Sequence, residues 1–255
     1  MISFRRIIWL SLSILLFAIG CDTARATSTS TPAPGGGTYL DFPIPKPILE
    51  IPLFDSKGSK FSLGDYKGKW LVLSDFLTSC QEVCPMTSAN MQKIANRFLS
   101  KKISDQIKVL ELSVDGWRDN PARLKAYQGL FDDNSWVLGS STVKYLDTFW
   151  QFFGIGIEKS NYSKSELKNL PADWQSGKVQ TFDITHADAV LLISPNQHWK
   201  WLDLGTPKTD DKKIPETLKK VLTNDGIQNL NKPEEPTWST SAVYSAVSHY
   251  LNVAL

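Results

Sequence analysis

The chain has 255 residues, and its 28 basic and 26 acidic side chains leave a formal net charge of only +2. The sequence has no basic block of the kind that binds nucleic acid, so we expect no nucleic-acid partner. Nine tryptophans and twelve phenylalanines can supply a sizeable core, and the length suits one large or decorated domain.

The N-terminal segment predicts export and attachment to a membrane. Arg5 and Arg6 precede an apolar stretch, residues 7–19, which is too short for a comfortable transmembrane helix. The small residues before Cys21 resemble a bacterial lipoprotein signal, which implies a signal peptide over residues 1–20 and lipidation of Cys21. An uncleaved membrane anchor is the alternative. Both interpretations place the rest of the chain outside the cytoplasm, tethered to the cell membrane.

The exported part of the chain is expected to consist of a tether, a folded domain and a C-terminal extension. Asp22, directly after the lipidated cysteine, favours retention at the outer face of the inner membrane if the cell has two membranes. Residues 21–38 are rich in Thr, Ser, Ala, Pro and Gly, which is typical of a flexible tether. We expect a folded domain over residues 39–224 and a C-terminal extension over residues 225–255.

Strands and helices alternate through the folded domain. In chain order the patterns predict a hairpin over 52–63 that turns at 55–58, a buried strand over 70–77, a helix over 85–101, a strand over 107–114, helices over 121–131 and 143–153, a strand pair over 189–194 and 199–204, and helices over 214–223 and 243–253. This alternation indicates an α/β protein with a thioredoxin-like three-layer fold and an N-terminal hairpin. Residues 155–182 are an insertion before the strand that follows His186.

The cysteine pattern is the strongest chemical signal. Cys80-Gln-Glu-Val-Cys84-Pro85 follows the apolar run over 71–77, and its i, i+4 spacing lets both sulfurs face the same way on one helical turn. A disulfide between Cys80 and Cys84 would close a very short loop and would constrain the unfolded chain little. The pair is therefore expected to bind metal or to cycle between dithiol and disulfide. Two soft thiolates with His186, at the start of another apolar run, make a ligand set suited to copper.

Several segments together resemble the Sco/SenC/PrrC family of thioredoxin-fold copper proteins, which is associated with cytochrome c oxidase assembly. The resemblance covers roughly residues 47–222 and rests on the segments 54–58, 66–69, 80–85, 113–121 and the strand opened by His186. The chain departs from the family pattern at four positions. Gln81 and Gly116 replace prolines, Asn120 replaces a threonine, and Ser79 stands where a histidine often precedes the first cysteine.

The resemblance implies that Cys80, Cys84 and His186 bind one copper ion, as Cu(I) or Cu(II). Asp183 or Asp188 is expected to orient the second ring nitrogen of His186, since metal-bound histidines usually have such a partner.

Three functions fit these residues. The first is a membrane-tethered copper chaperone that is not an enzyme in the usual sense. It would deliver copper to the dinuclear centre of cytochrome c oxidase subunit II, with another copper chaperone as a candidate donor. The second is a thiol–disulfide oxidoreductase in which Cys80 and Cys84 form the redox-active pair and keep cysteines of that subunit or of other exported proteins reduced. The third is a copper or redox sensor.

Overall fold

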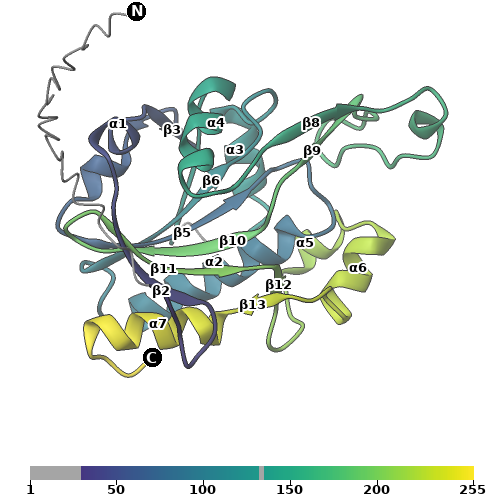
Figure 1. Ribbon diagram of the computed structural model, residues 1–255. Helices are drawn as coiled ribbons and strands as arrows, with labels where there is room; N and C mark the ends of the chain where they lie inside the picture. The colour runs from purple at the N-terminus through teal and green to yellow at the C-terminus, as the bar shows by residue number, and fades with distance from the viewer. Residues whose placement is uncertain (1–29, 132–134) are drawn as a thin grey trace, which may run out of the picture.

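The computed structural model describes residues 30–131 and 135–255, which form a mixed β-sheet covered by helices on both faces (Figure 1). The predicted signal peptide over residues 1–20 and the predicted lipidation of Cys21 lie outside the described residues. Within the described part of the chain, no helix combines the length and the apolar character needed to cross a membrane.

The main sheet has nine strands, and three central ones, β5, β6 and β7, are parallel to one another. From one edge to the other the order is β1 (Thr31–Pro32), β2 (Thr38–Pro43), β11 (His198–Leu204), β10 (Ala189–Ile193), β5 (Trp70–Phe76), β6 (Ile107–Ser113), β7 (Val137–Ser140), β3 (Leu53–Asp55) and β4 (Lys60–Phe61). Strand β10 pairs with β5 in the antiparallel sense, and β3 does the same with β7. Two small sheets pair β12 (Thr206–Lys208) with β13 (Thr237–Ser239) and β8 (Glu158–Asn161) with β9 (Phe182–Thr185).

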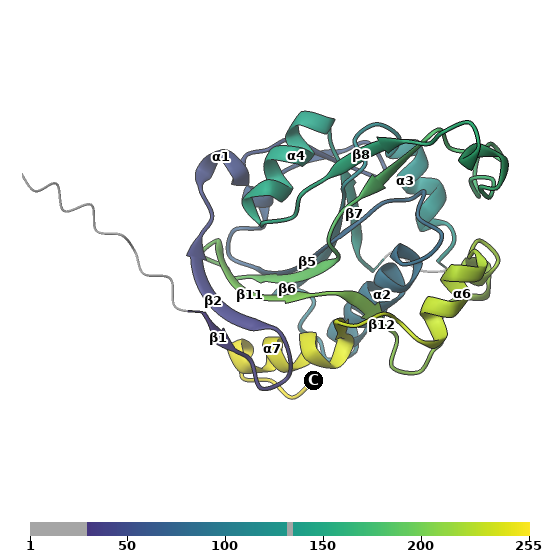
Figure 2. The same cartoon turned by 45° about the vertical axis from the view of Figure 1, so that its right-hand side comes forward.

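The helices form the outer two layers. They are α1 (Lys46–Leu49), α2 (Cys84–Ser100), α3 (Pro121–Gln128), α4 (Val143–Phe152), α5 (Glu216–Lys219), α6 (Asn224–Asn231) and α7 (Thr240–Leu251), with short 3-10 helices at Leu63–Tyr66 and Glu166–Lys168. Helices α2 and α7 lie on one face of the sheet, and α3 and α4 lie on the other (Figures 1 and 2). The three-layer α/β fold with a thioredoxin-like core, predicted from the alternation of elements, is therefore confirmed.

The centre of the sheet positions the candidate site. Residues 71–76 of β5 are all buried, because β5 has a strand on each side and helices above and below. A continuous apolar run is what such a strand requires. The chain leaves β5, makes the loop over 77–83 and enters α2 at Cys84, with Pro85 in the first turn, where a missing N–H is harmless. The carboxyl end of β5, the start of α2 and the start of β10 thus meet at one edge.

Both ends of the described chain are more closely joined to the domain than the sequence suggested. Part of the expected tether forms β1, and the Trp201 ring N–H donates a 3.0 Å hydrogen bond to the Gly36 carbonyl. The C-terminal extension contributes Trp238 and Val247 to the buried core. The helix expected over 214–223 is reduced to the four residues of α5, because the chain turns after it and Thr223 caps the next helix, α6.

Candidate metal centre

The two cysteines of the motif lie at the N-terminus of α2. Cys84 is the first residue of the helix and is buried, whereas Cys80 is half-buried in the preceding loop. The Cys80 sulfur accepts hydrogen bonds from the backbone N–H groups of Val83 (3.3 Å) and Cys84 (3.4 Å). The Cys84 sulfur accepts one from the N–H of Leu77 (3.4 Å). Both thiols are free, so both sulfurs can serve as ligands.

The two thiols differ in acidity. Hydrogen bonds from the Cys84 side chain and from backbone N–H groups lower the pKa of Cys80 to about 6, against the opposing effect of burial. Burial raises the pKa of Cys84 well above its usual value, and the neighbouring Cys80 raises that pKa further. At neutral pH Cys80 is therefore the thiolate of the pair, and Cys84 holds its proton until a cation or a reaction displaces it.

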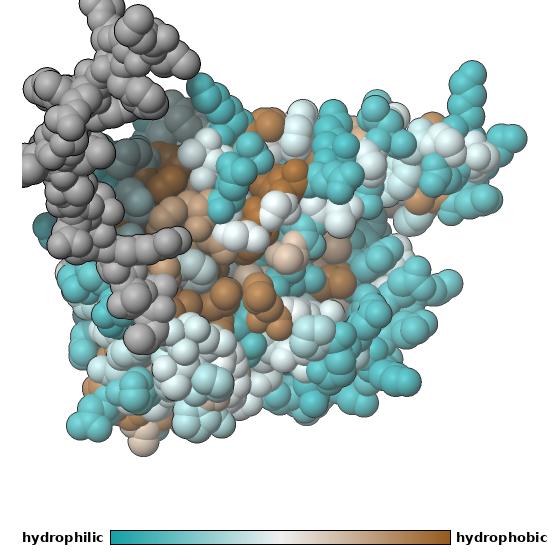
Figure 3. Space-filling view, viewed as in Figure 1, coloured by the Kyte–Doolittle hydropathy of each residue, from teal (hydrophilic) through white to brown (hydrophobic). Residues whose placement is uncertain are grey.

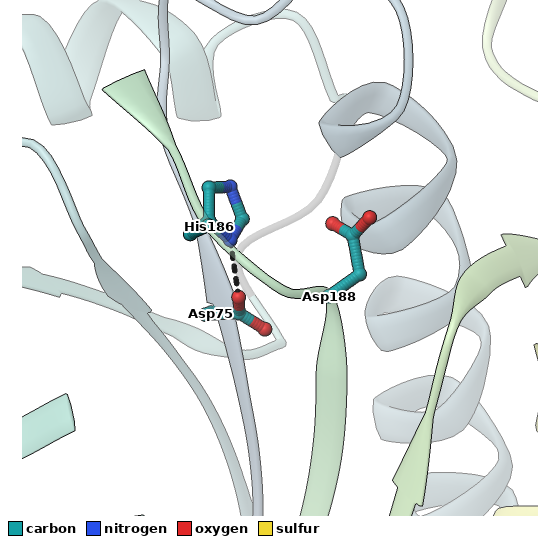
Figure 4. A group of neighbouring side chains, drawn as sticks. All are labelled: Asp75, His186 and Asp188. Carbon is teal, nitrogen blue, oxygen red and sulfur yellow. Dashed lines mark hydrogen bonds and ion pairs between the residues drawn. The ribbon is translucent and has the colours of Figure 1, made fainter. Parts of the chain in front are cut away.

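His186 lies just before β10 and faces the carboxyl end of β5. Its side chain is only 6% exposed, and its Nδ1 lies 2.6 Å from an Asp75 carboxylate oxygen (Figure 4). Burial by itself would lower the pKa of His186, but the adjacent Asp75 raises that pKa to about 9. The hydrogen bond fixes the ring and occupies Nδ1, which leaves Nε2 as the ring nitrogen available to a metal.

Asp75 is the carboxylate that the sequence interpretation missed. It is 1% exposed, and its second oxygen accepts a 2.8 Å hydrogen bond from the N–H of Ala189 at the start of β10. Asp183 is one of the two residues expected to orient the His186 ring. In the structure its carboxylate accepts a 2.9 Å hydrogen bond from the N–H of Ile184, and the carboxylate at His186 Nδ1 is that of Asp75. The only signal for Asp75 in the sequence was a charged residue within an apolar run.

Asp188, the other expected partner, lies close to the histidine and carboxylate pair. Asp75, His186 and Asp188 each offer a ligand atom, and these atoms lie within 4.8 Å of one another. Burial raises the pKa of Asp188 to about 7, and the negative charge of Asp75 acts in the same direction. Figure 4 shows the Asp188 side chain beside the hydrogen-bonded pair of His186 and Asp75, between that pair and α2.

The two cysteines, the histidine and two of the three aspartates line a single pocket. It has a volume of about 360 Å³, and Cys80, Cys84 and His186 all line it together with Asp183 and Asp188. In the space-filling view the molecule is hollowed between the projecting β8–β9 arm and the part that contains α6, and both projections are largely hydrophilic (Figure 3). The three ligands expected from the sequence thus line one pocket, although about a hundred residues separate the histidine from the cysteines. Among the described residues, the group whose ligand atoms lie within 4.8 Å of one another is Asp75, His186 and Asp188.

The predicted insertion forms one wall of this pocket. Phe182, in β9, packs under the Arg118 guanidinium at 4.2 Å from the ring centre, and both residues line the pocket. Further along the insertion, the Trp174 ring N–H donates a 2.6 Å hydrogen bond to the Thr78 carbonyl, two residues before Cys80. A buried ion pair between Arg123 and Asp173 also joins the insertion to α3. The insertion is therefore attached to the loop that carries the first cysteine.

The chain matches the model of a known protein family and is similar in sequence to two known proteins. The model of the SCO1/SenC family matches residues 50–223. The chain is 28% identical over 166 residues to the SCO1 protein homolog of Bacillus subtilis, which covers 63% of this chain and 75% of that protein. It is 26% identical over 115 residues, 45% of its length, to a Stutzerimonas stutzeri protein named for copper binding, and spans 56% of that relative.

Solved structures of the same family are also similar. A SCO1/SenC family lipoprotein from Bacillus anthracis superposes with a TM-score of 0.47 and 22% identity, covering 71% of this chain and 90% of that one. ScoI from Bradyrhizobium japonicum, solved with copper bound, gives a TM-score of 0.46 and 19% identity over 72% of this chain and 96% of that one. Because the family model matches most of the chain, including both cysteines and the histidine, this protein belongs to the SCO1/SenC family.

Proposed function

We propose that this protein is a copper chaperone that binds one copper ion through the sulfurs of Cys80 and Cys84 and the Nε2 of His186. The observation that supports this most strongly is the convergence of two sulfurs and one oriented imidazole on a single pocket. Thiolates favour Cu(I), and a mixed sulfur and imidazole set serves Cu(II), so one site can hold either state. The Stutzerimonas relative named for copper binding is in keeping with this cargo.

The proposed route of the copper is from a donor chaperone to the dinuclear centre of cytochrome c oxidase subunit II. Cys80 is half-buried at an open pocket, so a ligand of a partner protein can reach the metal while Cys84 and His186 still hold it. The protein would carry out this exchange at the outer face of the cell membrane, held there by lipid on Cys21. The family membership supports this recipient, and the N-terminal sequence supports the lipid anchor.

A second candidate function is thiol–disulfide exchange, which the unequal acidity of the cysteines favours. The Cys80 thiolate would attack a substrate disulfide, form a mixed disulfide and release one substrate thiolate. Cys84 would then lose its proton, attack the Cys80 sulfur and release the second substrate thiolate, which leaves Cys80–Cys84 oxidised and the substrate reduced by two electrons. His186 is not needed for these steps.

Copper titration of the full-length protein in detergent, reduced and metal-free, distinguishes the copper chaperone from the thiol–disulfide oxidoreductase. The chaperone function predicts one tight equivalent of copper with a sulfur-to-Cu(II) charge-transfer band, lost in Cys80→Ala and Cys84→Ala and weakened in His186→Ala. His198→Ala is the matched control, because His198 pairs with Asp41 at 2.6 Å, away from the pocket. Rapid disulfide exchange without stoichiometric copper binding would instead establish the oxidoreductase.

A further inference from the structure

The segment over residues 221–229, where the folded domain meets the C-terminal extension, touches the loop between the two cysteines. The Gln81 side chain donates a 2.7 Å hydrogen bond to the Val221 carbonyl, and the Gln81 carbonyl accepts one of 3.1 Å from the N–H of Thr223. The side chain of Asn229 donates a longer one, 3.5 Å, to the carbonyl of Glu82. Two of the three residues between the cysteines are thus held by the segment over 221–229.

The contact is close enough to require glycine. Gly226 lies in the first turn of α6, and a Cβ atom placed on it would lie 2.3 Å from the carbonyl oxygen of Gln81. Thr223 caps the same turn, since its hydroxyl accepts a 3.1 Å hydrogen bond from the N–H of Gly226. The backbone of α6 therefore packs directly on the backbone of the inter-cysteine loop, without an intervening side chain.

The segment that makes this contact is itself anchored. After α6, strand β13 pairs with β12, and α7 buries Val243 and Val247 in the core. The Tyr250 hydroxyl donates a 2.9 Å hydrogen bond to the Lys200 carbonyl in β11. The chain that follows α6 is therefore fixed to the small β12–β13 sheet and to the core, and Leu230 near the end of α6 is itself buried.

We propose that α6 and the residues before it act as a brace that holds the inter-cysteine loop in its metal-binding geometry, with Gln81, Thr223 and Gly226 as positioning residues. The Cys80 sulfur takes its hydrogen bonds from the N–H groups of Val83 and Cys84, at the other end of the braced loop. Fixing the loop therefore fixes the separation of the two sulfurs and slows the loss of bound copper. This last consequence rests on the proposed copper site, whereas the restraint on the loop does not.

Gly226→Ala in the full-length protein tests the brace, because its new methyl group pushes α6 away from Gln81. In the reduced, metal-free variant, the backbone N–H groups of residues 79–84 are expected to exchange with solvent about tenfold faster, as a loop does when its local opening is favoured. Loaded with Cu(I), the variant should lose its metal to excess bathocuproine disulfonate faster by a similar factor. Gly156→Ala is the control, since nothing lies within 4 Å of a Cβ at that position.

Each outcome decides one part of the proposal. Faster exchange with faster copper transfer supports the brace and its role in retention. Faster exchange with unchanged copper transfer overturns the role in retention. If the wild type takes up no copper and exchange still accelerates, the brace stands and the proposed function fails. Should Gly226→Ala not fold, Gln81→Ala removes only the 2.7 Å hydrogen bond, and unchanged exchange in that variant overturns the brace.

Discussion

Asp75 shows how one buried carboxylate can serve both the fold and the site. A charged group within a central strand is costly unless hydrogen bonds compensate it, and Asp75 has two: the Ala189 N–H and the ring of His186. The sequence alone could not reveal this role. Asp75 and His186 are far apart in the chain, and only the antiparallel pairing of β10 with β5 brings them together.

We expect Asp75→Asn to lower copper affinity about 10- to 100-fold, because a neutral amide holds the ring less firmly and makes Nε2 less basic. Competition with a Cu(I) chelator measures this. Asp41→Asn is the matched control, since Asp41 makes a 2.6 Å pair with His198 outside the pocket. Equal affinities of the Asp75 variant and the wild type would show that the carboxylate does not support the metal.

Glu111, fully buried in β6, gives a prediction about pH. It accepts hydrogen bonds from Ser88 (2.8 Å) and from the Trp136 ring (2.6 Å), yet burial raises its pKa from 4.5 to about 8. The folded state therefore keeps a proton that the unfolded state loses. The free energy of unfolding should fall by about 1.4 kcal/mol for each pH unit between these two pKa values and then level off.

Glu111→Gln removes this ionisation and keeps the shape of the side chain. Its stability relative to the wild type should therefore rise from pH 5 to pH 8 in urea unfolding followed by tryptophan fluorescence. Glu50→Gln, at an exposed residue paired with Lys46, controls for the general effect of losing a carboxylate. Parallel pH profiles for the wild type and Glu111→Gln would contradict the prediction.

At the scale of elements, strands and helices with a clear apolar pattern could be predicted from the sequence. Elements without such a pattern could not, because they form only through pairing with neighbouring parts of the fold. The strand over 70–77 and the helix over 85–101 match β5 and α2 to within one residue at each end. Strand β7 was missed because it is only four residues long and contains Gly139. The β8–β9 pair was missed because β8 is exposed and polar throughout, and because β9 alternates apolar and polar residues over only four positions.

Arg123 holds the inserted segment to the rest of the domain. Its guanidinium forms an ion pair with Asp173, and its Nε donates a 2.5 Å hydrogen bond to the Thr78 hydroxyl. The Arg123 Nε also lies 3.6 Å from an Asp119 carboxylate oxygen, so Arg123→Ala leaves the carboxylates of Asp119 and Asp173 buried without their cation. We expect a loss of about 3–5 kcal/mol in the free energy of unfolding.

Chemical denaturation measures this loss, and limited proteolysis should show faster cleavage within the insertion, residues 155–182. Lys93→Ala is the control, because the pair of Lys93 with Asp211 is partly exposed and should contribute no more than about 1 kcal/mol. A similar small effect for both variants would mean that the insertion is held by its other contacts.

At the scale of the whole molecule, the C-terminal extension is part of the domain. Val243 and Val247 on α7 are fully or nearly fully buried. Val247→Asp would place an unpaired charge there, so we expect a large loss of stability and poor solubility. Ser241→Asp, on the exposed side of the first turn, should be tolerated, as thermal unfolding of the two variants can show. Similar melting temperatures would mean that α7 is dispensable to the core.

The two oxygens of Asp75 give the molecule an internal indicator of occupancy. One oxygen faces the imidazole of His186 and the other accepts from the N–H of Ala189, in a strand of the sheet. In the proposed copper site, one Cu(I) would replace two protons, one on the His186 ring and one on Cys84. The positive charge near the Asp75 carboxylate would therefore fall, and the hydrogen bond from Ala189 would change with it. The amide signal of this one residue in a ¹H–¹⁵N spectrum should therefore follow metal loading in real time, from a nitrogen that never touches the metal.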